Sequence, residues 1–192
     1  DYMGDMRLYL DALLDHRDGR EGGSEVFFGV LKWKMPCNWK LPAENFIGDS
    51  YHGISHRSVE MVGIGPGGEG QERHGFKSQA RVRQSGIVSF PGRGHGAITG
   101  PPVVGGETQW PEFISPQGPL DNMPVVAEYF ERLKEERRRR HEGEERPRPG
   151  NGTVFPNMSF HPWFPRSIVV WHPVGPYMTE AWRWFVVDAD AP

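Results

Sequence analysis

Apolar side chains recur at the spacing of amphipathic helices in three parts of the chain. Over residues 6–19, methionine and leucine stand at positions i, i+4, i+7 and i+8, which predicts a first helix. A second helix is predicted over residues 39–59, because Pro42 and Glu44 suit its first turn. A third is predicted over residues 124–140, where an apolar stripe lies above a charged face. The stripe consists of Val126, Tyr129, Phe130 and Leu133.

Short apolar runs bounded by turn residues predict strands in much of the remaining chain. The predicted strands cover residues 26–35, 80–90, 153–160, 167–172 and 179–187. Proline and glycine separate the last three runs. These three strands are therefore expected to be antiparallel neighbours joined by short connections.

Glycine and proline interrupt the predicted elements often, since the chain holds 25 Gly and 18 Pro in 192 residues. Residues 63–75 are predicted to be a glycine-rich loop, residues 92–119 a long irregular loop, and residues 142–151 a mobile polar segment. Helices and strands occur in separate runs without βαβ alternation, which predicts the α+β class. We expect a single domain, residues 1–192, with an antiparallel β-sheet and helices packed on one face in a helix-grip-like arrangement.

Composition excludes several classes of protein. A content of 12% aromatic residues argues against disorder, and a net charge of −3 gives no electrostatic reason to expect nucleic acid or an anionic membrane as a partner. The sequence contains neither an apolar stretch of about 18 residues nor a secretory leader. Cys37 is the single cysteine, so this chain alone can form no internal disulfide and hold no iron–sulfur cluster. A cytoplasmic location is expected.

Four polar residues of the second predicted helix share one helix face. At about 100° per residue, they fall within a sector about 60° wide. They are Asn45, Asp49, His52 and His56. Two imidazoles one turn apart can direct their nitrogens at one metal ion, although imidazole suits iron, zinc, copper or nickel and does not select among them. Asp49 favours a metal site, because metal-bound histidines often donate their second ring nitrogen to a carboxylate.

A histidine pair at this spacing arises readily by chance in a chain with eight His, but its neighbours form a more specific pattern. The pattern comprises Asn38-Trp39-Lys40, Glu44-Asn45-Phe46, Gly48-Asp49 and Tyr51-His52. Further segments accompany it: Gly94-His95-Gly96, Asn151-Gly152-Thr153-Val154-Phe155-Pro156-Asn157, Ser159-Phe160, Trp171-His172-Pro173 and Glu180-Ala181-Trp182. Together these segments resemble the catalytic domain of the Rieske-type aromatic-ring-hydroxylating dioxygenase large (alpha) subunits, such as the naphthalene dioxygenase group.

The resemblance implies that His52 and His56 are two ligands of a mononuclear Fe(II) and that the third ligand is a carboxylate beyond the last predicted strand. Three residues separate these histidines, where members of the family usually have four or five. Asp49 would be a catalytic residue that carries electrons and hydrogen bonding from a Rieske cluster in the neighbouring subunit. The implied substrate-binding residues are Asn45, Phe46 and Asn157.

The reaction implied by the resemblance inserts both atoms of O₂ into an aromatic hydrocarbon and gives a cis-dihydrodiol. NADH would supply two electrons through a reductase and often a ferredoxin. The electrons would pass through a 2Fe–2S Rieske cluster in an N-terminal domain that is not part of this sequence. Implied partners are other large subunits, in a trimer, and a small β subunit.

Three other functions stay open on the sequence. A related Rieske-type monooxygenase or demethylase would use the same helix motif. A domain that binds an apolar ligand without redox chemistry would use the histidines as polar groups of its pocket. A zinc hydrolase could also use a histidine pair, but no glutamate stands between His52 and His56 to act as the base.

Overall fold

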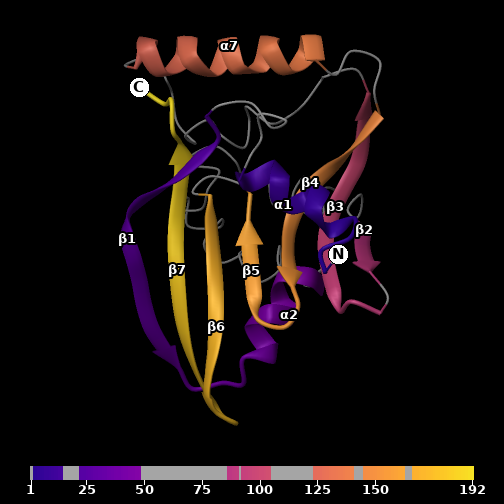
Figure 1. Cartoon of the computed structure of the whole chain (residues 1–192), viewed down its shortest axis with the longest axis vertical. Coiled ribbons are helices and arrows are strands. Elements are labelled where there is room, and N and C mark those ends of the chain that lie inside the picture. Colours follow the sequence, from indigo (N-terminus) through magenta and orange to yellow (C-terminus); the bar gives the residue numbers. More distant parts are fainter. Residues whose placement is uncertain are drawn as a thin grey trace, which may run out of the picture.

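A computed structural model describes residues 2–14, 22–48, 86–90, 92–104, 123–140, 145–162 and 166–192. Its centre is an antiparallel sheet of seven strands in the order β1-β7-β6-β5-β4-β3-β2 (Figure 1). The strands are β1 (Ser24–Met35), β2 (Gly86–Phe90), β3 (His95–Val104), β4 (Glu145–Val154), β5 (Met158–His161), β6 (Ser167–Gly175) and β7 (Met178–Asp188). The helices are α1 (Met6–Leu14), α2 (Lys40–Gly48) and α7 (Pro124–Arg140).

Most predicted elements are confirmed. The helices α1 and α7 and the strands β1, β6 and β7 coincide with predicted segments apart from a few terminal residues. The strand β2 forms the end of the strand predicted at residues 80–90. The helix α2 confirms the first half of the second predicted helix. Residues 49–59 and the loop predicted at residues 63–75 lie outside the described part of the chain.

The prediction of one irregular loop over residues 92–119 is wrong for its first part, because β3 pairs with both β2 and β4. Glycine in β3 suggested a loop, but at Gly96 it permits a close contact with α2. A Cβ atom built at Gly96 would lie 2.6 Å from the Ile47 Cγ2 atom. The glycine therefore serves the packing of a helix on a strand rather than a turn.

Two predictions around β4 also need correction. The segment expected to be mobile over residues 142–151 contributes the first residues of β4, which begins at Glu145 and pairs with β3. The single strand expected over residues 153–160 is two strands, because the turn Phe155-Pro156-Asn157 separates β4 from β5. Proline has no N–H group for a sheet, so it marks the break that the apolar pattern obscured.

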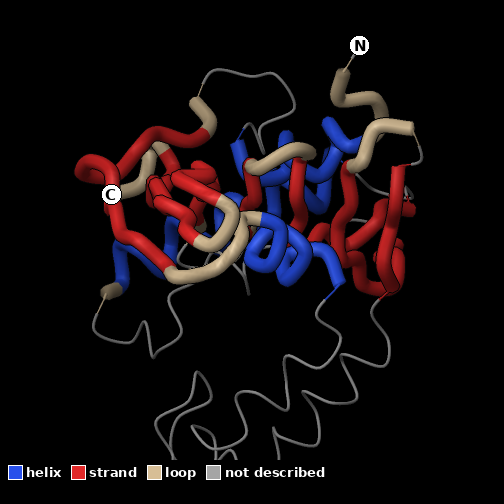
Figure 2. The backbone as a smooth tube through the Cα atoms, turned by 90° about the horizontal axis from the view of Figure 1, so that it is seen from below, coloured by secondary structure: helices blue, strands red, loops and turns tan. Residues whose placement is uncertain are grey.

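Each face of the sheet carries its own apolar core, because successive side chains of a strand point to opposite faces. Val154 and Phe160 pack in one cluster with residues of α1. Their neighbours Thr153 and Ser159 point to the other face, where Ala43 of α2 is buried. Helix therefore lies on both sides of the strands (Figure 2). The α+β class with an antiparallel sheet is confirmed, and its helices are divided between two faces rather than gathered on one.

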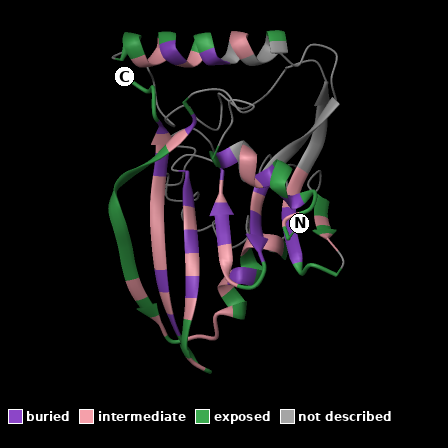
Figure 3. Cartoon of the chain, viewed as in Figure 1, coloured by how far each residue is buried: buried purple, intermediate pink, exposed green. Residues whose placement is uncertain are grey.

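The two chain-terminal strands lie side by side at one edge of the sheet, where β1 pairs with β7 from Ser24↔Asp188 to Met35↔Thr179. Most of β1 is exposed, as its colouring shows in Figure 3. The helix α7 crosses the end of the sheet (Figure 1) and buries Tyr129 and Leu133. None of the helices in the described ranges is long and apolar enough to cross a membrane.

Candidate active site

The beginning of α2 is fixed to the hairpin between β6 and β7. Asn38 caps the helix, because its Oδ1 atom accepts a hydrogen bond of 3.0 Å from the Lys40 N–H group. The Nδ2 group of Asn38 donates to the carbonyl oxygen of Pro176 at 2.8 Å. The Thr179 hydroxyl donates to the carbonyl oxygen of Cys37 at 2.8 Å. The motif that contains Asn38 thus sets where α2 begins on the sheet.

The body of α2 packs on aromatic side chains of the sheet. The rings of Phe46 and Trp171 meet edge to face with centroids 5.8 Å apart, and Trp33 meets Trp171 at 6.4 Å. Ala43, Val169 and Ala181 are buried around them. The cluster therefore places an apolar aromatic wall beside α2, the helix that precedes His52 in the sequence.

A chain of hydrogen bonds joins this cluster to the backbone of α2. The Trp171 Nε1–H group donates to the Ser159 hydroxyl at 2.8 Å, and the hydroxyl groups of Ser159 and Thr153 are 2.7 Å apart. The Thr153 hydroxyl donates to the carbonyl oxygen of Ala43 at 2.7 Å. All of these polar groups are buried. The same face carries Arg183, which donates to the Ser167 hydroxyl and whose pKa is lowered by burial.

The structure describes three of the six predicted site residues. Phe46 is half-buried against Trp171, and Asn45 is exposed on α2. Asn157 lies in the turn between β4 and β5, where its Nδ2 group donates to the carbonyl oxygen of Trp171 at 2.9 Å. Phe46 and Asn157 therefore meet at the same tryptophan. Asp49, His52 and His56 lie outside the described residues.

Asn151 is a site residue that sequence reasoning missed as an individual. It stands two positions before Thr153 in β4, so its side chain lies on the face that α2 covers. Its Oδ1 atom is buried and has no hydrogen-bond partner among the described residues. A buried amide oxygen without a partner is costly, which makes it a candidate to contact a bound molecule. Its one sequence signal was membership of the segment that ends at Asn157.

Two other groups that could bind a metal already have partners. The Phe155 N–H group donates to His95 Nδ1 at 3.0 Å, so the proton of the neutral imidazole is on Nε2, which lies 2.9 Å from the carbonyl oxygen of Tyr2. The Asp188 carboxylate accepts hydrogen bonds from Arg166 at 2.6 Å and from Tyr129 at 3.0 Å. Within the described part of the chain, no three His, Cys, Asp or Glu side chains are grouped to hold a metal ion.

His172, in the segment Trp171-His172-Pro173, faces away from α2. It follows Trp171 in β6, so its side chain lies on the opposite face of the sheet. Its ring lies 4.8 Å from the ring of Trp182, and the Lys32 ammonium lies 3.6 Å from the centre of that ring. His172 is therefore separated by the sheet from the aromatic cluster beside α2.

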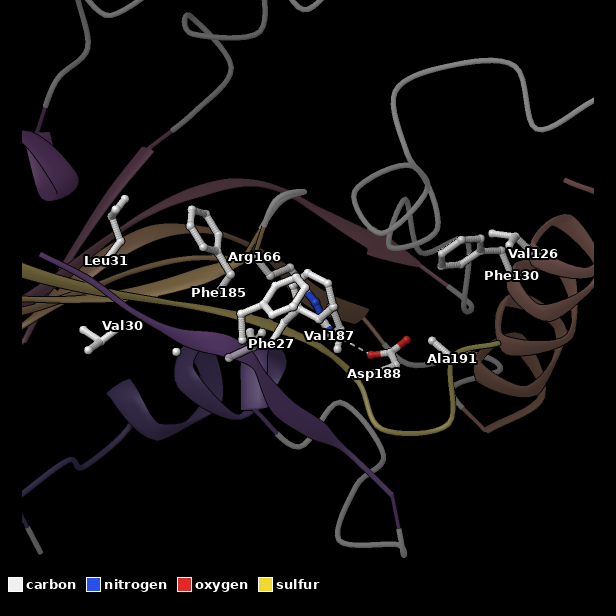
Figure 4. A pocket seen from close by; sticks show the side chains of 13 residues that line it. Phe27, Val30, Leu31, Val126, Phe130, Arg166, Phe185, Val187, Asp188 and Ala191 are labelled. Atoms are coloured by element: carbon white, nitrogen blue, oxygen red, sulfur yellow. Dashed lines mark hydrogen bonds and ion pairs between the residues drawn. The ribbon is translucent and has the colours of Figure 1, made fainter. Parts of the chain in front are cut away.

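An apolar groove of about 770 Å³ lies between β1, β7 and α7. Its walls include Phe27 and Phe185 from the sheet and Phe130 from the helix, and Figure 4 shows these side chains around the Arg166–Asp188 ion pair. None of its lining residues belongs to α2 or to the cluster around Trp171. The groove is thus separate from that cluster and lies at the edge of the sheet.

The family described as ring hydroxylating alpha subunit (catalytic domain) matches residues 25–192. The chain belongs to this family. It is 35% identical over 193 residues to benzene 1,2-dioxygenase subunit alpha of Pseudomonas putida, with all of the chain and 39% of that protein covered. It is 32% identical over 199 residues to biphenyl 2,3-dioxygenase subunit alpha of Rhodococcus jostii, with all of the chain and 38% of that protein covered. The match to this family therefore covers both α2 and the sheet.

Solved structures agree with the sequence comparisons. Naphthalene 1,2-dioxygenase from Rhodococcus sp., bound to indole, superposes with a TM-score of 0.59 at 30% identity. The superposition covers all of this chain and 41% of the naphthalene dioxygenase chain. A naphthalene 1,2-dioxygenase with indole bound in the active site superposes with a TM-score of 0.61 at 27% identity, and 40% of it is covered. The chain therefore spans well under half the length of the relatives that it matches.

Proposed function

We propose that the protein is the large subunit of the oxygenase component of a ring-hydroxylating dioxygenase, and that it cis-dihydroxylates an aromatic hydrocarbon with O₂ at a non-haem Fe(II). One observation carries the proposal. In this chain, which belongs to the family, α2 packs against aromatic side chains of the sheet, and His52 and His56 follow α2 in the sequence. A flat hydrocarbon offers little polar surface to hold, so an aromatic wall suits it.

The donor set of the chain fits ferrous iron. We assign His52 and His56, which follow α2 in the sequence, as two metal ligands because of their spacing and of the sequence pattern around them, whereas His95 and Asp188 are engaged in hydrogen bonds. Two neutral imidazoles and one carboxylate form the facial set typical of non-haem Fe(II) oxygenases and leave positions open. When bound, the iron would supply the activation of O₂. The third ligand, a carboxylate, is not assigned to any residue here.

The residues beside α2 would bind and orient the substrate. Phe46 and Trp171 form an apolar wall that excludes water, and Asn45 stands one residue before Phe46 on the helix. We assign Asn151 as a polar group of the pocket, because its buried Oδ1 atom has no partner among the described residues. Asn157 would act at the pocket edge, since its amide group holds the β4–β5 turn against Trp171.

Electron supply would involve partners. In this proposal Asp49 links the iron site to a 2Fe–2S Rieske cluster of a neighbouring large subunit, and NADH provides electrons through a reductase and a ferredoxin. Relatives carry the name subunit alpha, and one is the large oxygenase component of a naphthalene 1,2-dioxygenase system. A trimer of large subunits, with or without a small β subunit, is the assembly that we propose.

The histidine assignment is tested by metal content and turnover in the protein as its gene encodes it. His52→Ala and His56→Ala are expected to lower bound iron at least about tenfold, because each removes one of three ligands. His172→Gln is the control, since His172 lies on the opposite face of the sheet. Iron content and arene oxidation that survive in both alanine variants would contradict the assignment and favour a domain that only binds apolar ligands.

A further inference from the structure

The hydrogen bonds between the sheet and α2 run in one direction only. An indole nitrogen can only donate, so the Ser159 oxygen accepts from Trp171 at 2.8 Å. The Ala43 carbonyl oxygen can only accept, so the single hydroxyl hydrogen of Thr153 is used there, at 2.7 Å. The hydrogen between the two hydroxyl groups therefore belongs to Ser159, which donates to Thr153 at 2.7 Å. Each of the two hydroxyl hydrogens in this relay of hydrogen bonds therefore has one defined acceptor.

This relay joins three strands to one atom of the helix backbone. Trp171, Ser159 and Thr153 come from β6, β5 and β4, and Ser159 pairs directly with Thr153 in the sheet. Thr153 is 2% exposed and Ser159 is fully buried, so water cannot replace a lost bond without entering the core. The relay therefore ends in a bond that only a correctly placed α2 can complete.

Asn38 holds the first turn of α2, but apolar packing alone does not fix the body of the helix along its axis. Contacts such as Phe46 on Trp171 are non-directional and allow a helix to slide by part of its rise of about 1.5 Å per residue. A hydrogen bond to one particular carbonyl oxygen opposes that movement, because its geometry is lost within about 0.5 Å. Displacements of about 1 Å at reacting groups can cost a hundredfold in rate.

We propose that Thr153 is a positioning residue for the iron site, which acts by holding the Ala43 carbonyl of α2, with Ser159 and Trp171 orienting its hydroxyl group. This inference rests on the proposed function, because the histidines that α2 leads to are the ligands assigned there. Thr153 touches neither substrate nor metal in this role. It holds the body of α2, the helix that precedes the assigned ligands in the sequence.

Two substitutions distinguish an effect on the position of α2 from an effect on the general stability of the protein. Thr153→Val keeps the side-chain shape but removes two bonds of the relay, including the bond to α2. Ser159→Ala also removes two bonds but leaves the bond to α2 in place. The two variants therefore lose equal numbers of buried hydrogen bonds, and Thr153→Ser restores the hydroxyl group as a rescue.

The experiment compares these variants in the protein as its gene encodes it, by hydrogen exchange at the α2 amides of residues 44–48 and by the rate at which a ferrous chelator removes iron. Thr153→Val is expected to speed both about tenfold relative to Ser159→Ala and to lower the product formed per O₂ consumed. Thr153→Ser is expected to restore both rates.

Two results would overturn the inference. One is equal exchange at α2 in Thr153→Val and Ser159→Ala. The other is faster exchange in Thr153→Val with iron release and coupling unchanged, which would make Thr153 a structural residue only. A wild-type protein that holds no iron would instead contradict the proposed function, and exchange at α2 would still decide whether Thr153 holds the helix.

Discussion

At the scale of single residues, polar groups buried in the sheet decide which side chains remain able to contact a ligand. His95 was part of the sequence pattern, but both its ring nitrogens lie within hydrogen-bond distance of backbone atoms. Asn157 was predicted as a pocket residue, and its amide group holds a turn. Asn151 was not singled out, yet its Oδ1 atom is one of three buried side-chain atoms without a hydrogen-bond partner in the described residues, with Arg166 Nη1 and His172 Nε2. Hydrogen-bond saturation is a tertiary property, so residue identity could not predict it.

The buried ion pair of Arg166 and Asp188 gives a residue-scale prediction. Their side chains are 3% and 2% exposed and 2.6 Å apart. Asp188→Asn is expected to lower the free energy of unfolding by about 3 kcal/mol, because it leaves a guanidinium buried without its counter-charge. Tyr129→Phe removes only a neutral donor to the same carboxylate and is expected to cost about 1 kcal/mol. Chemical denaturation checks both, and equal losses would refute the argument.

At the scale of elements, periodicity predicted the helices and most strands but not the strands rich in glycine and proline. The strand β3 was missed because Gly96 was interpreted as part of a loop, whereas α2 packs against it. The second half of the helix predicted over residues 39–59 stays a prediction, since it lies outside the described residues. The helix cap at Asn38 could be anticipated from sequence, but its bond to Pro176 depends on a turn 138 residues away.

The close approach of α2 to β3 gives an element-scale prediction. In Gly96→Ala the new methyl group would lie 2.6 Å from the Ile47 Cγ2 atom, so the Ile47 side chain or α2 itself must shift. We expect a loss of about 2 kcal/mol in the free energy of unfolding, together with faster hydrogen exchange in α2. Gly86→Ala is the matched control in β2, where the nearest atom would be Thr99 Cγ2 at 3.7 Å. Indistinguishable stabilities of the two variants would show that the contact is not tight.

At the scale of the whole molecule, the class of fold could be predicted because helices and strands fall in separate runs. The strand order could not, because β1 and β7 pair over a sequence separation from Ser24 to Asp188. Local patterns carry no information about such a pairing. For the proposed metal site, too, some features are visible in the local sequence and others depend on distant parts of the chain. The histidine pair is visible in sequence, whereas the aromatic wall beside α2 is assembled from Trp33 and Trp171 on distant strands.

The measurement that tests the central claim most directly is product analysis under a mixture of ¹⁶O₂ and ¹⁸O₂. The protein as its gene encodes it, supplied with NADH and its electron-transfer partners, is incubated with naphthalene and with benzene. We expect from at least one arene a cis-dihydrodiol whose two oxygen atoms are both ¹⁶O or both ¹⁸O, because both come from one O₂ molecule. A phenol with a single labelled oxygen would indicate a monooxygenase, and diols of mixed label or no oxidation of either arene would contradict the account.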